Sequence, residues 1–207
     1  MLINSDFAIS KSRLNSGAKD SFNDELLWSN FKMGNELALS MLYKKHVHRL
    51  YDYGMHTSRD HDMVMDCLQD LFYQLWSKRE SISTVKAVKP YLFKSFRRLL
   101  IHQIIADRKH SSPLPENEMF EFMPSVESVL IEDEIRAEQN IRLKACIQSL
   151  TKGQREVIYL KFYNELTYPE IAEITELQID SVYNLVSKTI ELLRKKLQVA
   201  KPHIPLL

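Results

Sequence analysis

Apolar residues recur at three- and four-residue steps through most of the chain, the spacing of one buried face of an α-helix. One such stretch begins at Leu26, and Gly54 is expected to end it. Two more cover residues 64–75 and 90–104, and Pro90 is expected to open the second because the first helical turn tolerates its missing N–H. The pattern therefore predicts a three-helix unit in the N-terminal half of the chain.

Three prolines interrupt residues 111–125, so this segment is expected to be a linker rather than a helix. Beyond it, Thr151 and Thr167 are each followed three residues later by Gln154 or Glu170. A hydroxyl and an amide or carboxylate at this spacing form a capping box that starts a helix. No stretch alternates with period two for long enough to indicate a sheet. The expected fold class is all-α, with two small helical domains, an N-terminal helical bundle and a C-terminal helix-turn-helix bundle, joined by an acidic linker.

Shifts in composition divide the chain into five parts. They are a mobile N-terminal tail at 1–22, a first domain at 23–108, the acidic linker at 109–135, a second domain at 136–200 and a C-terminal tail at 201–207. The first residues lack the pattern of a secretory signal, and no apolar run approaches the ~20 residues that span a bilayer. We therefore expect a cytoplasmic protein without direct membrane insertion.

Composition argues against several classes of active site. The chain has 207 residues and only 4 glycines, none close together, which excludes Gly-rich phosphate loops. Cys67 and Cys146 are too far apart in sequence to support a disulfide framework or a cysteine-based zinc site. His46 and His48 are two residues apart, so they diverge on a helix and do not share a metal ion. With no nucleophile elbow or zinc-protease motif present, we expect neither catalysis nor a metal or other cofactor.

Charge is strongly segregated although the net charge is only +1. Residues 78–110 contain nine basic and two acidic side chains, giving +7, and residues 111–140 contain one basic and eight acidic, giving −7. Residues 185–201 contain five basic side chains and one acidic, giving +4. Two basic segments around an acidic one indicate binding to nucleic acid, because cationic patches release counterions from phosphates. The acidic segment is also able to screen the first basic segment and keep the free protein compact.

The sharpest local motif is a helix-turn-helix within residues 167–194. A short helix is expected from Tyr168 to about Thr175, followed by a turn and a second helix that starts at Ile179 with that residue facing inward. The outward face of the second helix combines hydroxyls, a phenol, an amide and an ammonium. Its residues are Ser181, Tyr183, Asn184, Ser187 and Lys188. Such a face can contact base edges and phosphates in a major groove.

Four sequence segments resemble the extracytoplasmic-function (ECF) sigma factors of the sigma-70 family. Residues 149–160, SLTKGQREVIYL, and 166–174, LTYPEIAEI, resemble the promoter-reading C-terminal domain of that family. Residues 66–72, DCLQDLF, resemble its polymerase-binding helix, and residues 91–97, which end in Arg97, resemble the helix that engages the minus-ten element. The resemblance covers roughly residues 25–198 and implies a non-enzymatic initiation factor that guides RNA polymerase to promoters.

The resemblance implies three sets of contact residues. The polymerase-binding set would dock on the clamp helices of the largest polymerase subunit and consists of Asp66, Gln69, Asp70, Tyr73 and Trp76. The set for the minus-ten element consists of Arg79, Ser81, Ser83, Lys86, Lys94, Arg97, Arg98 and Arg108. The set for the minus-35 element consists of Thr167, Tyr168, Ser181, Tyr183, Asn184, Ser187, Lys188 and Arg194.

The resemblance also implies further partners, and the chain departs from the family pattern in three places. The expected partners are core RNA polymerase, including the flap of its second-largest subunit, promoter DNA and an anti-sigma factor. The linker is expected to run through the polymerase. Glu176 stands where the helix-turn-helix turn usually carries glycine, and Arg98 stands where asparagine is common. In the second helix of that motif, Tyr183 and Leu185 stand where basic residues are common.

The alternative interpretation is a stand-alone helix-turn-helix regulator with an N-terminal helical dimerisation or sensor domain. Such a protein would bind duplex operators by itself as a symmetric dimer. A sensor domain gives no reason to combine an acidic docking helix with a helix of charge +7, so the sequence favours the sigma-factor interpretation.

Overall fold

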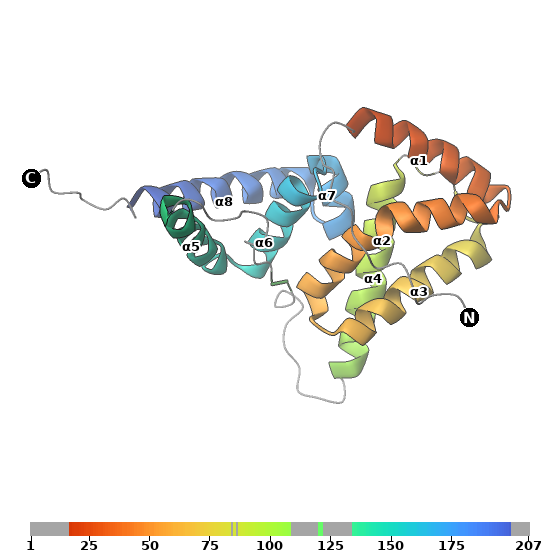
Figure 1. The fold of residues 1–207 in the computed structure, drawn as a ribbon, viewed down its shortest axis with the longest axis horizontal. Helices are drawn as coiled ribbons and strands as arrows, with labels where there is room; N and C mark the ends of the chain where they lie inside the picture. The colour runs from red at the N-terminus through yellow and green to blue at the C-terminus, as the bar shows by residue number, and fades with distance from the viewer. Residues whose placement is uncertain (1–16, 84, 86, 109–119, 122–133, 200–207) are drawn as a thin grey trace, which may run out of the picture.

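The computed structural model describes residues 17–83, 85, 87–108, 120–121 and 134–199. Within these ranges the regular structure is helical, which confirms the all-α prediction (Figure 1). In chain order the elements are α1 (Gly17–Lys32), α2 (Glu36–Ser58), α3 (His61–Lys78), α4 (Val88–Arg108), α5 (Glu134–Gln148), α6 (Lys152–Ile158), the π-helical turn η2 (Tyr159–Tyr163), α7 (Tyr168–Thr175) and α8 (Ile179–Val199). No helix in the described ranges is long and apolar enough to cross a membrane.

Helices α1–α4 form the N-terminal half around a core of aromatic and aliphatic side chains. Phe31, Leu50, Phe96 and Leu100 are all completely buried there. The N-terminal tail was predicted to extend to residue 22, but α1 already begins at Gly17 and adds a fourth helix to the expected three.

A buried charge cluster ties α1 to α2. Asp24 of α1 lies 3.0 Å from the His46 ring and 2.8 Å from the Lys45 ammonium. Burial alone would raise the pKa of Asp24, but the bonds from His46 and Lys45 outweigh it and lower that pKa. The charged carboxylate is therefore the favoured form, and it fixes the position of α1 on the bundle.

The prediction that Gly54 ends a helix is wrong, because α2 continues through it to Ser58 and is capped by Arg59 at φ 60°. A Cβ atom at residue 54 would lie 2.8 Å from Cγ1 of Val64 and 3.0 Å from the Phe96 ring. Glycine at this position therefore permits the close approach of α2 to α3 and α4 rather than a turn.

Helices α5–α8 form the C-terminal half, and both predicted capping boxes are present. The Thr151 N–H donates to Oε1 of Gln154 at 2.9 Å, and the Thr167 N–H donates to Oε2 of Glu170 at 2.7 Å. Helix α7 follows the second box and leads through a tight turn into α8 (Figure 1). The expected inward position of Ile179 is wrong, since its side chain is 51% exposed at the start of α8.

Candidate nucleic-acid interface

The first turns of α8 present a continuous polar face to solvent, as the sequence predicts. Its members are Ser181, Tyr183, Asn184, Ser187 and Lys188, and all five are exposed. On the other side of the helix Val182 and Val186 are completely buried. Arg194, further along α8, is also exposed. One face of α8 therefore packs on the domain while the other is free to enter a groove.

An aromatic pair joins the start of α7 to this face. The Tyr168 ring centroid lies 5.0 Å from that of Tyr183, whose side chain is 56% exposed. The Lys161 ammonium lies 4.6 Å from the Tyr168 ring centroid and donates to the Leu166 carbonyl at 3.1 Å. Lys161 was not singled out by the sequence pattern, because no linear spacing places it beside residue 168. The hydroxyl of Thr167, the preceding N-cap, accepts a bond from the helix backbone.

The turn between α7 and α8 places Glu176 in the left-handed region, with φ 60° and ψ 24°. Glycine adopts this conformation without strain, whereas a residue with a Cβ pays ~1–2 kcal/mol. The chain therefore keeps the backbone of a glycine turn although the glycine of the family pattern is missing.

The basic residues that α4 contributes to the predicted minus-ten set do not share one open surface. Lys94 and Arg97 face the C-terminal half, where the Lys94 ammonium lies 3.6 Å from Glu173 and the Arg97 Nε donates to Glu156 Oε1 at 2.8 Å. Arg98 lies on the opposite edge of the basic face and is exposed. The basic side chains are therefore divided between two directions, because Arg97 and Arg98 are adjacent in sequence and point ~100° apart around the helix.

Glu156 of α6 receives two bonds from the N-terminal half. The same oxygen that accepts from Arg97 also accepts the Tyr53 hydroxyl at 2.6 Å. Burial disfavours the charged form of Arg97, but Glu156 outweighs it and raises the pKa of Arg97. Burial and then Glu156 raise the pKa of Tyr53 well above its ordinary value, so the phenol stays protonated and donates.

Arg98 lines a hollow of about 510 Å³ between α3 and α4. Lys78 and His102 add nitrogen donors, and the half-buried ring of Tyr91 contributes an aromatic surface. Phe93, one of the aromatic residues of this helix, is completely buried and is not available to a ligand. Cations beside aromatic and aliphatic groups are the combination that single-stranded nucleic acid requires.

The segment between α3 and α4 contributes part of the predicted minus-ten set. The Arg79 guanidinium lies 4.6 Å from the Trp76 ring centroid and donates to the Trp76 carbonyl at 2.9 Å. Ser81 and Ser83 are exposed. Two other predicted members, the whole of Lys86 and the side chain of Arg108, lie outside the described residues.

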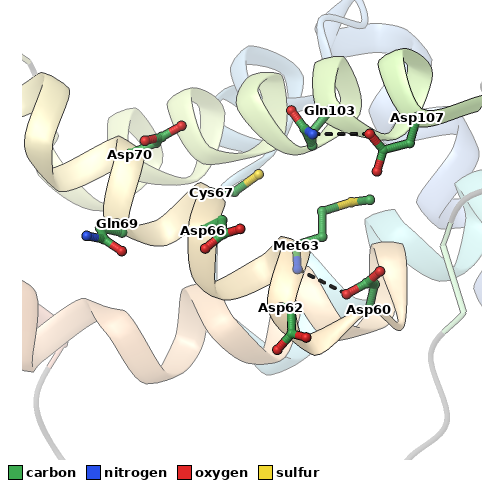
Figure 2. Close-up of a pocket in the computed structure, with 9 residues that line it drawn as sticks. All are labelled: Asp60, Asp62, Met63, Asp66, Cys67, Gln69, Asp70, Gln103 and Asp107. Atoms are coloured by element: carbon green, nitrogen blue, oxygen red, sulfur yellow. Dashed lines mark hydrogen bonds between the residues drawn. The ribbon is translucent and has the colours of Figure 1, made fainter. Parts of the chain in front are cut away.

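Three of the predicted polymerase-binding residues of α3, Asp66, Gln69 and Asp70, line an acidic pocket, whereas Tyr73 and Trp76 lie outside its lining. Asp66, Gln69, Asp70 and Tyr73 are exposed, and Trp76 is half-buried. The pocket has a volume of about 560 Å³, and Figure 2 shows its carboxylates projecting from α3 and α4. These carboxylates are Asp60, Asp62, Asp66, Asp70 and Asp107.

The pocket's negative potential acts on the one thiol in its lining. Burial, followed by Asp70, Asp66 and Asp107, raises the pKa of Cys67 to about 11. In the part of the chain that the structure describes, no group of three or more potential ligands could hold a metal ion. The carboxylates of the pocket offer a cationic partner a broad acidic surface.

Two residues at the boundary between the halves were not singled out by the sequence analysis. Glu156 is the carboxylate that binds Arg97, and Phe120 of the acidic linker is almost completely buried among aromatic rings. Both contacts join residues far apart in sequence, so no local pattern signals them. Most of the linker lies outside the described residues, and with it the predicted screening of the basic segment.

The family model for "Sigma-70, region 4" matches residues 140–193, which include α7 and most of α8. The ECF RNA polymerase sigma factor SigK of Mycolicibacterium vanbaalenii is 25% identical over 168 residues, covering 79% of this chain and 83% of its own length. The ECF RNA polymerase sigma factor RpoE of Cereibacter sphaeroides is 24% identical over 162 residues, covering 78% of this chain and 87% of its own length.

Two solved structures share the fold. CnrH, in complex with the cytosolic domain of CnrY, superposes with a TM-score of 0.54 at 17% identity, covering 86% of this chain and 99% of that chain. The sigma factor RpoE, in complex with the anti-sigma factor NepR from Bartonella quintana, also superposes with a TM-score of 0.54. Its identity is 20%, and the match covers 78% of this chain and 98% of that chain. The expected arrangement of two helical domains is thereby confirmed.

Proposed function

We propose, from the premise that this chain is an extracytoplasmic-function sigma factor of the sigma-70 family, that each of its halves reads one promoter element. Like its relatives, the chain is an initiation factor that directs RNA polymerase to promoters. The observation that carries the finer proposal is the exposed polar face of α8, which lies within the match to sigma-70 region 4.

The C-terminal half reads the minus-35 element with this face. Asn184 can form two hydrogen bonds with an adenine edge, and the hydroxyls of Ser181 and Ser187 suit either partner of a base pair. Lys188 and Arg194 bind backbone phosphates and fix the register of the helix. Tyr183 is oriented by its contact with Tyr168.

The N-terminal half binds the minus-ten element in its melted form. Arg98 and Lys78 supply positive charge at the hollow between α3 and α4, and Tyr91 supplies a face on which a base can stack. The exposed hydroxyls of Ser81 and Ser83 lie in the loop that, by resemblance to the family, captures an unpaired base.

The acidic pocket of α3 is the docking surface for core polymerase. Its carboxylates suit a basic partner surface, and the exposed ring of Tyr73 adds apolar contact area. The structural neighbours CnrH and RpoE are each held by a second protein, which for RpoE is an anti-sigma factor. We include an anti-sigma factor among the partners on this likeness.

Reconstituted transcription tests the proposal. Core polymerase with this chain should start transcripts at defined sites in a random promoter pool, and an Asp66→Asn, Asp70→Asn variant should lose polymerase binding by about tenfold or more. Glu25→Gln, an exposed carboxylate of α1, is the matched control and should bind normally. DNA binding without polymerase recruitment would instead support the stand-alone regulator.

A further inference from the structure

A linker residue fills a socket built by both halves of the chain. Phe120 is 3% exposed, and its ring centroid lies 5.7 Å from Tyr53, 5.9 Å from His56 and 5.5 Å from Tyr159. Tyr53 and His56 belong to α2, whereas Tyr159 belongs to η2. These three rings, the aromatic socket, also contact one another across the boundary, with His56 and Tyr159 4.9 Å apart. Phe120 is therefore buried only while the halves stay together.

The next residue pins the linker to the end of α2. The Glu121 N–H donates to the His56 carbonyl at 2.6 Å, and Nδ1 of His56 lies 3.1 Å from the Glu121 carbonyl. The Glu121 carboxylate pairs with the Arg59 guanidinium. The last carbonyls of a helix lack partners within it, so the linker satisfies one that would otherwise need water. These contacts fix the direction in which Phe120 enters the aromatic socket.

The same closed arrangement engages two cations of the predicted minus-ten set. Glu156 holds Arg97, leaving that side chain 22% exposed, and Glu173 lies against Lys94, whose side chain stays 39% exposed. Both carboxylates come from the C-terminal half and take positions that DNA phosphates would need. Arg97 therefore cannot bind Glu156 and a phosphate at the same time with the same Nε donor.

Promoter geometry requires the halves to separate. Elements centred at minus-ten and minus-35 lie about 25 base pairs apart, which is ~85 Å of duplex at 3.4 Å per base pair. Helix α8 has 21 residues and is ~31 Å long, and it packs on α7, which itself contacts α4. With α4 and α7 in contact, the two proposed reading surfaces cannot reach both elements.

We propose that Phe120 and Glu121 form an intramolecular latch that holds the free chain closed, with Arg97 largely covered by the C-terminal half and Lys94 paired with it. A partner that draws the linker out of the aromatic socket releases both halves together. Core polymerase is the partner expected to do this, a part of the inference that rests on the proposed function. The closed contact itself rests on the described residues alone.

Single-molecule energy transfer measures the latch directly. Dyes are placed on cysteines introduced at two exposed sites, Glu25 in α1 and Lys195 in α8, while the native Cys67 and Cys146 are buried. Phe120→Ala should lower the ratio of closed to open molecules by about 10- to 100-fold, the range expected for exposing one buried phenylalanine. Phe162→Ala, an exposed phenylalanine of the C-terminal half, is the matched control and should leave the ratio unchanged.

A second variant keeps the test decisive if the closed state is very stable. Phe120→Ala combined with Glu156→Gln removes both the ring and the charge pair and should yield a clear open population. A double variant as closed as the parent chain would overturn the latch. The measurement needs no DNA or polymerase, so the latch can fail while the proposed function stands.

The same labelled chain also tests the trigger. Added core polymerase should convert the parent chain to the open state, and the Phe120→Ala variant should open at a lower polymerase concentration. If the variants open but polymerase leaves the parent chain closed, the latch stands and the polymerase arm of the proposed function fails.

Discussion

Replacing Glu176 by glycine should stabilise the protein, although it removes a side chain and gains no contact. The residue is held at φ 60°, where a Cβ costs ~1–2 kcal/mol and glycine has no such penalty. Glycine also raises the conformational entropy of the unfolded chain, which lowers the free energy of unfolding by ~0.5–1 kcal/mol. The net expectation is a gain of ~0.5–1 kcal/mol in the free energy of unfolding, or ~1–4 °C in Tm for a chain of this size.

Urea unfolding followed by circular dichroism measures this difference, and two controls separate its causes. Glu176→Ala removes the charge but keeps a Cβ, so it should change stability by less than ~0.5 kcal/mol. Ala145→Gly, at an exposed position in α5, should cost ~1 kcal/mol because that backbone is helical. If Glu176→Gly destabilises the chain as much as Ala145→Gly does, the strain argument is wrong.

Three further predictions concern recognition and the closed state. Asn184→Ala should relax base preference at one position of the minus-35 element by ~1–3 kcal/mol in a promoter library. An unchanged preference would show that Asn184 does not contact a base from the polar face of α8. Arg98→Ala should weaken binding of a single-stranded minus-ten oligonucleotide and reduce its salt dependence by about one phosphate contact, which a titration at several salt concentrations measures. Burial holds the pKa of His56 below its ordinary 6.5, with Asp52 opposing it only in part, so the neutral ring favours the closed state. The open fraction should therefore rise as pH falls below about 6.5 and stay constant above it, and His56→Asn should abolish that rise.

Local rules were sufficient for the helices of the C-terminal half. The capping boxes at Thr151 and Thr167 involve residues three apart, so the sequence contains everything needed to place the starts of α6 and α7. The outward face of α8 followed from helical spacing for the same reason. The prediction that Ile179 faces inward was wrong because this residue lies in the first turn of α8, beyond the part of the helix that packs on the domain.

Contacts between distant segments could not be read from the sequence. Gly54 resembles a helix stop in the linear pattern, and its real constraint, the side chain of Val64, becomes visible only when α2 and α3 are packed. Arg97 looks like a free cation for the same reason, since its partner Glu156 is 59 residues away. Phe120 lies in a proline-interrupted stretch beside Met119, Phe122 and Met123, and no helical periodicity there marks it as the buried residue.

The pairing of Lys94 and Arg97 with glutamates has a consequence for the unoccupied factor inside a cell. A cation that is paired with a carboxylate displaces no counterion from DNA. The slope of log affinity against log salt concentration therefore becomes less steep by ~0.9 for each such contact. A chromosome offers ~10⁶–10⁹ competing sites of arbitrary sequence. If the proposed function and the latch hold, a free molecule with these two charges paired is retained less by those sites and stays available to core polymerase.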